Sequence, residues 1–290
     1  MKIKQTLFLI IFAIAGIFLF RALTKPAQTS EQNTSNTPAL PPAKKQPIVI
    51  SDQSPTHTKS QKIQNSPAGA LPNERIVSFS SQEALEDYLR SIKGSGLYVI
   101  GQSHYSPTLR IGFKDQRAFL NSLPAGAQTQ FNFPVETPPI AEGEINPNAS
   151  PFQGRLKEWM GVFGDNSEWG SGVSVAVIDS GLLPHSAFGS DVNVFSVAGD
   201  PNNPDLNSHG TAMASLWRSA DGVIPALAPA VDLTSIQVAD DNGDANLFNL
   251  AEAIFLAVEE GAQLIPISMG AANSNDLLDT AITHAMMRAF

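Results

Sequence analysis

Two short segments place an acid and an imidazole where they could act together. Asp179 ends an apolar, mostly β-branched run at 173–178, so we expect it at the C-terminal end of a buried strand. His209 precedes a series of small residues, which predicts a tightly packed helix that begins at the histidine. A buried carboxylate can hold an imidazole in one tautomer and stabilise the imidazolium that forms when the ring accepts a proton. The pair therefore indicates general acid–base catalysis beside a nucleophile.

Each segment also has a simpler interpretation when it is taken alone. Asp179 could cap the following turn, with Gly181 supplying the bend, and His209 could be a polar residue with a local hydrogen bond. Together the two segments are more informative, because the acid comes first and the histidine follows 30 residues later. Acid, histidine and serine occur in this order in one of the known chain orders of the catalytic triad.

The elements that must position this pair alternate between strands and helices in the C-terminal region, residues 155–290. Runs of buried character at 173–178 and 264–269 predict strands, and helices are expected at 247–258 and from 276 onward. The face of the helix at 247–258 is formed by Leu247, Leu250, Ile254 and Val258. Such alternation predicts an α/β fold with a parallel sheet flanked by helices, in which ligand sites lie beyond the C-terminal ends of the strands.

A smaller unit, the N-terminal module of residues 74–135, precedes this region. Its pattern predicts the order β-α-β-β-α-β, one of the recurrent α+β units. Ser80 and Glu83 have the spacing of a capping box, so we expect Ser80 to open the first helix. The apolar residues that follow at helical spacing are Leu85, Tyr88, Leu89 and Ile92.

The beginning of the chain has the pattern of an export signal. Lys2 and Lys4 precede an apolar run, so residues 1–25 are expected to be a signal peptide or an uncleaved membrane anchor, with membrane contact through residues 5–23. Residues 26–73 are rich in Pro, Ser, Thr, Gln and Asn and are expected to be a disordered linker. Residues 136–154 are aperiodic and are expected to form a second linker.

Charge and cysteine content exclude several classes of function. The chain has a net charge of −9, but residues 1–73 carry eight Lys/Arg against two Asp/Glu, while residues 151–290 carry four against 17. An acidic C-terminal half argues against a nucleic-acid partner, because phosphates require a basic surface. The absence of cysteine excludes disulfides, thiolate zinc sites and a cysteine nucleophile.

The sequences VAVIDSGL around Asp179 and NSHGTAMAS around His209 resemble the Asp and His motifs of the subtilisin (subtilase) family of serine proteases. Residues 261–270, which end in Ser-Met-Gly, are similar to the family's strand ending in Ser-Leu-Gly. Residues 222–229 resemble its Gly-Val-Ala-Pro turn, and residues 159–172 resemble the start of the mature enzyme. The N-terminal module resembles the propeptide that precedes the catalytic domain in this family.

The resemblance implies a serine endopeptidase with Asp179 and His209 as catalytic residues and a polypeptide as substrate. The substrate would add as a strand beside Ser268, Met269 and Gly270, with the turn that contains Gly243 flanking it. The N-terminal module would bind in cis as an inhibitor. No cofactor and no metal site are expected: the loop at 218–222 is shorter than the family's calcium loop. Pro266 departs from the family, which commonly has asparagine there.

The resemblance also implies a nucleophilic serine and an oxyanion-binding asparagine, both further along the chain than Phe290. We therefore expect the sequence to be part of an exported protease, secreted or tethered to a membrane with its catalytic region outside the cytoplasm. This chain alone is then expected to be inactive and its α/β sheet incomplete. The alternative is a non-catalytic product whose N-terminal module binds or inhibits a related protease.

Overall fold

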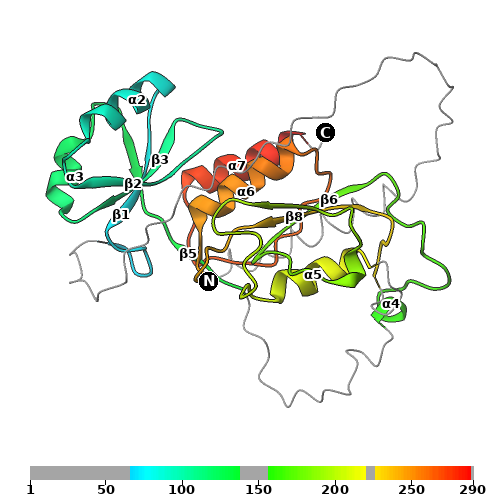
Figure 1. Cartoon of the computed structure of the whole chain (residues 1–290). Coiled ribbons are helices and arrows are strands. Elements are labelled where there is room, and N and C mark those ends of the chain that lie inside the picture. Colours follow the sequence, from blue (N-terminus) through cyan, green and yellow to red (C-terminus); the bar gives the residue numbers. More distant parts are fainter. Residues whose placement is uncertain (1–65, 138–155, 220–225, 289–290) are drawn as a thin grey trace, which may run out of the picture.

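The computed structural model describes residues 66–137, 156–219 and 226–288. They form a small antiparallel sheet with two helices and a larger α/β region (Figure 1). The expected signal or anchor at 1–25, most of both linkers and the turn at 222–225 lie outside these residues. Within the described ranges, no helix has the length and hydropathy needed to cross a membrane.

The N-terminal module has the expected β-α-β-β-α-β order. Its strands pair in an antiparallel sheet of order β2-β3-β1-β4, and apolar side chains from both helices cover the sheet. The elements are β1 (Glu74–Ser78), α2 (Gln82–Ser91), β2 (Leu97–Gln102), β3 (Thr108–Phe113), α3 (Gln116–Ser122) and β4 (Gln128–Gln130). The expected helix cap was wrong by one residue: Ser81, not Ser80, accepts a hydrogen bond from the Ala84 N–H.

The C-terminal region is built on a parallel sheet of order β6-β8-β7. Its strands are β6 (Ser174–Asp179), β7 (Asn193–Ser196) and β8 (Asp232–Gln237). Its helices are α4 (Leu156–Trp159), the short 3₁₀ turn η2 (Ser186–Phe188), α5 (His209–Trp217), α6 (Leu247–Glu259) and α7 (Asp276–Arg288). Two short strands, β5 (Pro134–Val135) and β9 (Ala245–Asn246), pair with each other between the module and this region.

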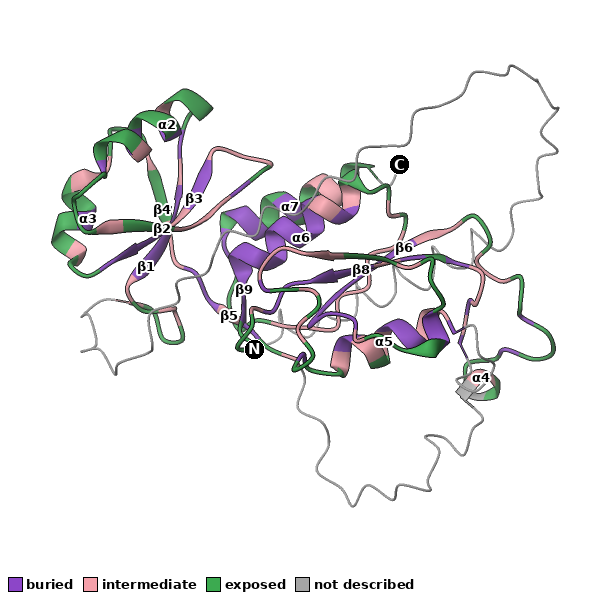
Figure 2. Ribbon diagram, viewed as in Figure 1, coloured by how far each residue is buried: buried purple, intermediate pink, exposed green. Residues whose placement is uncertain are grey.

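Helices cover both faces of the parallel sheet, and the alternation of side chains along β6 decides which residue meets which helix. Ala176 and Ile178 pack in the cluster formed with α6 and α7, whereas Val175 and Val177 pack in the cluster formed with α5. Because side chains alternate with a period of two, Asp179 lies on the α5 face. Burial along α6, which lies between the sheet and α7, agrees with this layered arrangement (Figure 2).

The strand expected at 264–269 is interrupted in the structure. It forms parallel bridges from Leu264 to Val175 and from Ile267 to Ile178, but no continuous ladder. Ala176 donates its N–H to the Leu264 oxygen, so its carbonyl faces the same segment, where Pro266 has no N–H to offer. The proline therefore removes a ladder bond at the edge of β6, which explains the interruption.

Candidate active site

Asp179 and His209 meet at the C-terminal end of β6. The His209 Nδ1 atom lies 2.8 Å from Asp179 Oδ1 and 3.0 Å from Oδ2. The Asp179 side chain is 1% exposed and that of His209 is 15% exposed, so the carboxylate is almost enclosed while the imidazole reaches the surface. An Nδ1–H donated to the carboxylate leaves the lone pair of Nε2 available to accept a proton. The arrangement can support general base catalysis.

Ser180 connects the two segments that carry the pair. Its N–H donates to Asp179 Oδ1 at 2.7 Å, so the oxygen that lies nearest the imidazole is also held by the backbone. Its hydroxyl donates to the Asn207 carbonyl at 2.9 Å and accepts the Gly210 N–H at 3.1 Å. The side chain of Asn207 also accepts the His209 N–H at 2.9 Å. These bonds hold the first turn of α5 against the end of β6.

Gly210 allows α5 to approach the loop after Asp179 closely. A Cβ atom at this position would run into the Gly181 carbonyl and would lie 3.0 Å from the Gly181 nitrogen and 3.2 Å from Asp179 Cβ. Gly181 itself has φ +116°, a conformation that other residues adopt only with strain. The two glycines thus set the distance between the imidazole and the carboxylate.

Residues 134–136, at the end of the module and the start of the second linker, lie as a strand between two parts of the C-terminal region. On one edge Pro134 and Val135 pair antiparallel with Asn246 and Ala245. On the other edge Glu136 exchanges two backbone hydrogen bonds with Gly270, at 2.8 and 2.9 Å. Val135 is buried and Glu136 is exposed, as alternation along a strand requires. The region can therefore hold an extended peptide by backbone pairing on both sides.

The structure separates the four residues expected to bind substrate. Gly270 pairs directly with the inserted strand, and Met269 packs against the core beneath it. Ser268 lies between the bridge at Ile267 and this pairing. Gly243 occupies the tip of the turn before β9, where its N–H donates to the Asp240 carbonyl, and no hydrogen bond links it to the inserted strand among the described residues.

The sequence analysis missed Ala245 and Asn246, which pair with the other edge of the inserted strand. Only the pairing with Pro134 and Val135 in the folded structure identifies them. The sequence analysis also missed Asn132, a module residue with no exposed surface. No motif marks it, and its only signal is a polar residue within an otherwise apolar stretch.

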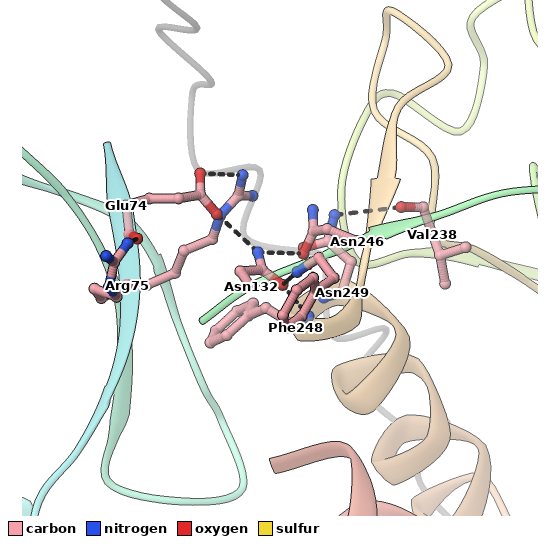
Figure 3. Close-up of polar contacts among 9 residues, drawn as sticks. Glu74, Arg75, Asn132, Val238, Asn246, Phe248 and Asn249 are labelled. Atoms are coloured by element: carbon pink, nitrogen blue, oxygen red, sulfur yellow. Dashed lines mark hydrogen bonds and ion pairs between the residues drawn. The ribbon is translucent and has the colours of Figure 1, made fainter. Parts of the chain in front are cut away.

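Both the nitrogen and the oxygen of the Asn132 side-chain amide form hydrogen bonds that join the module to the start of α6 (Figure 3). Its Nδ2 donates to Glu74 Oε1 at 2.8 Å and to Asn246 Oδ1 at 3.1 Å. Its Oδ1 accepts the Phe133 N–H at 3.1 Å and the Phe248 N–H at 3.2 Å. Arg110 donates two hydrogen bonds to the Glu74 carboxylate, from Nε at 2.9 Å and from Nη2 at 2.8 Å. The network therefore extends to a charged pair within the module. The Phe248 bond satisfies one of the free N–H groups at the helix start.

Replacing Asn132 with alanine is expected to destabilise the chain by about 2 kcal/mol. The change would leave the Phe248 N–H buried without the partner that Asn132 supplies, at a cost of about 1–3 kcal/mol, while Asn246 Oδ1 keeps its hydrogen bond from the Asn249 N–H. Urea unfolding of the wild type and N132A measures the loss. The exposed Asn193 on β7 provides the control N193A, which should change stability by less than about 0.5 kcal/mol. Equal effects of the two substitutions would contradict the role given to Asn132.

Comparison with known proteins identifies relatives of this chain. Residues 170–289 match the model of the subtilase family. A thermostable alkaline protease of Halalkalibacterium halodurans is 29% identical over 119 residues, which are 40% of this chain and 33% of that protein. A thermophilic serine proteinase of Bacillus sp. strain AK1 is 24% identical over 254 residues, which are 82% of this chain and 60% of that protein. The chain thus spans between a third and three-fifths of the length of these relatives.

Solved structures share the fold over about three-quarters of the chain. Fervidolysin from Fervidobacterium pennivorans, a keratinolytic enzyme related to subtilisin, aligns with a TM-score of 0.56 at 16% identity. That alignment covers 78% of this chain and 40% of fervidolysin. The epidermin leader peptide processing serine protease of Staphylococcus aureus aligns with a TM-score of 0.55 at 16% identity, over 74% of this chain and 58% of that protein. At this identity the likeness establishes the subtilisin-like α/β fold.

Proposed function

Because residues 170–289 of this chain belong to the subtilase family, we propose that the protein is a serine endopeptidase in which Asp179 and His209 form two members of the catalytic triad. The observation that carries the proposal is the hydrogen-bonded pair itself, with a buried carboxylate at the end of the parallel strand β6 and an imidazole that reaches the surface. The third member, a serine, belongs by the resemblance to a segment further along the chain than the residues matched.

In the proposed reaction His209 acts first as a base and then as an acid. Its Nε2 takes the proton of the serine hydroxyl while the serine oxygen attacks the scissile carbonyl carbon. The imidazolium then gives that proton to the leaving amine as the peptide C–N bond breaks, and an acyl-enzyme remains. Water, deprotonated by the same nitrogen, hydrolyses the ester and regenerates the serine. Asp179 orients the ring and stabilises its cationic form throughout.

The substrate is proposed to be an extended polypeptide. Pairing of residues 134–136 with β9 and Gly270 supports this proposal, because it demonstrates that a strand fits between these two edges. Apolar side chains are favoured at the position of Val135, which is 4% exposed within the main core cluster. Ser268 and Met269 remain proposed substrate-binding residues.

The module is proposed to act as an inhibitor in cis, since its own strand occupies the position proposed for substrate. The length of the match with the Bacillus proteinase supports this idea: 254 aligned residues exceed the C-terminal region and extend into the module. Export from the cytoplasm, by a signal or an anchor at residues 1–25, is part of the same proposal and rests on the sequence pattern alone.

A second candidate function is non-catalytic binding of a related protease by the module. The observation that favours it is the module's separate core, formed entirely by its own residues. A fluorophosphonate probe, which reacts with activated serines, distinguishes the two functions when it is applied to the protein purified from its source. Labelling of a serine that disappears in H209A is the result expected of a protease. Unlabelled native protein that nevertheless inhibits a subtilisin would reject the first function in favour of the second.

A further inference from the structure

The turn between β2 and β3 of the module, residues 103–107, contacts α6 through charged and aromatic groups. The backbone N–H of His104 donates to Glu252 Oε2 at 3.0 Å, and His104 Nδ1 lies 3.6 Å from the same oxygen. The Glu252 side chain is 6% exposed, whereas that of His104 is 63% exposed. A buried carboxylate of the C-terminal region is thus covered by a histidine that belongs to the module.

The neighbouring residue Tyr105 anchors the same turn. Its hydroxyl donates to Glu259 Oε2 at 3.0 Å, and its ring stacks on Phe255 at 5.1 Å between centroids. Burial, the hydrogen bond to Glu259 and the nearby carboxylates raise the pKa of Tyr105 far above its usual value, so the hydroxyl stays protonated. Tyr105 fixes the turn at every physiological pH, and it does not neutralise the acidic face of α6.

The other Glu252 oxygen, Oε1, is buried and accepts no hydrogen bond among the described residues. A buried carboxylate with one unsatisfied oxygen is costly unless a cation lies nearby. Glu259 at the end of α6 and Glu260 at its C-cap add negative charge and act on Tyr105 in the same sense as Glu252. A hollow of about 530 Å³ lies between Tyr105 and α7. The titratable residues of α7 that line it are Asp276, Asp279 and His284. This surface favours a positive charge on the turn.

We propose that residues 103–107 and α6 form a pH-dependent clasp, which holds the module on the C-terminal region while His104 is an imidazolium and loosens when it becomes neutral. His104 is suited to this role because the ordinary titration range of histidine lies between pH 5 and 8. Release of the module as pH rises would relieve the inhibition assigned above, and this consequence rests on the proposed function.

The direction of the effect follows from the two states of His104. In the docked structure the Glu252 carboxylate, 3.6 Å from the imidazole, raises the pKa of His104, burial opposes this shift, and the charge of Glu259 raises the pKa further. An undocked His104 lacks these partners and titrates at lower pH. Protonated His104 therefore stabilises the docked state in full at pH values below the pKa that His104 has when undocked. This stabilisation is lost as the pH rises through the pKa that His104 has when docked.

Hydrogen exchange measured by mass spectrometry on the 290-residue chain tests the clasp. Peptides from α6 and from residues 100–108 are followed at pH 5 and pH 8 in the wild type, H104Q, E252Q and the double variant, after correction for the intrinsic rate at each pH. H104Q is expected to speed exchange of these peptides at pH 5 by roughly 1.5- to 5-fold, the range of a partly exposed ion pair, and to have no effect at pH 8. In the E252Q background the H104Q effect is expected to disappear.

The variant H284Q provides a matched control, because His284 is a second imidazole on the same hollow and contacts Phe255 from α7. It should leave the pH dependence of the turn unchanged. An H104Q effect of equal size at both pH values, or one that persists in E252Q, would overturn the clasp. NMR titration gives an independent reading in case E252Q perturbs the fold: the His104 midpoint should be higher in the docked wild type than in N132A, in which docking is weakened. These measurements require no catalysis, so the clasp and the protease proposal can fail separately.

Discussion

The substitution Asp179→Asn is expected to lower kcat of the complete protease by about 10⁴-fold while leaving its fold intact. Asparagine matches aspartate in size, so the packing around this 1%-exposed side chain should survive. However, an amide cannot hold His209 with its proton on Nδ1 as the carboxylate does, and it cannot stabilise the imidazolium. The ring would then present the wrong tautomer to the serine.

Steady-state kinetics on a peptide substrate, with circular dichroism to verify folding, measures this effect. Asp205, an exposed residue before α5, gives the matched control D205N, for which kcat should be unchanged. The variant H209A should lose a larger factor, about 10⁶-fold, and the D179N/H209A double variant should lose little more than H209A, because members of a triad act as a unit. A loss of less than tenfold in D179N would contradict the role proposed for Asp179.

The substitution Gly210→Ala is expected to damage both stability and activity. Its Cβ would meet the Gly181 carbonyl, which is backbone and cannot move aside as a flexible side chain can. Overpacking of this kind costs about 1–3 kcal/mol, and we expect the upper end. The better helix propensity of alanine recovers about 1 kcal/mol, so a net loss of about 2 kcal/mol remains. A displacement of α5 by about 1 Å would further reduce kcat by about 100-fold.

Thermal and urea unfolding of G210A measure the loss of stability, and the kinetic assay measures the loss of kcat. Gly270→Ala serves as the control for stability alone, because a Cβ there meets no atom within 4 Å and its φ is not in the positive range. Wild-type stability in G210A would mean that the contact between Gly181 and Gly210 does not set the geometry of the pair.

Local patterns predicted some elements of this protein, but they missed β7 and β8, and the strand expected at 264–269 forms only isolated bridges. The β-branched run before Asp179 and the small residues after His209 predict a strand and a helix, and the structure contains both, as β6 and α5. The order of the module was also readable: α2 has an apolar face of regular spacing, and Pro124 follows α3 closely. Details that depend on a single hydrogen bond could not be predicted from the sequence. Ser80 and Ser81 are both serines at the start of the helix, and only the geometry assigns the cap to Ser81.

The sequence by itself determined which residues could carry the chemistry, because Asp179 and His209 lie in two short motifs whose residue types and order along the chain can be read without the structure. The tertiary structure decided which long-range contacts hold the module against the C-terminal region. Asn132 meets the Phe248 N–H across 116 residues, and His104 meets Glu252 across 148. Partners so far apart leave no periodic signal, since their contact depends on how the module packs against α6. Only folding brings them to one surface.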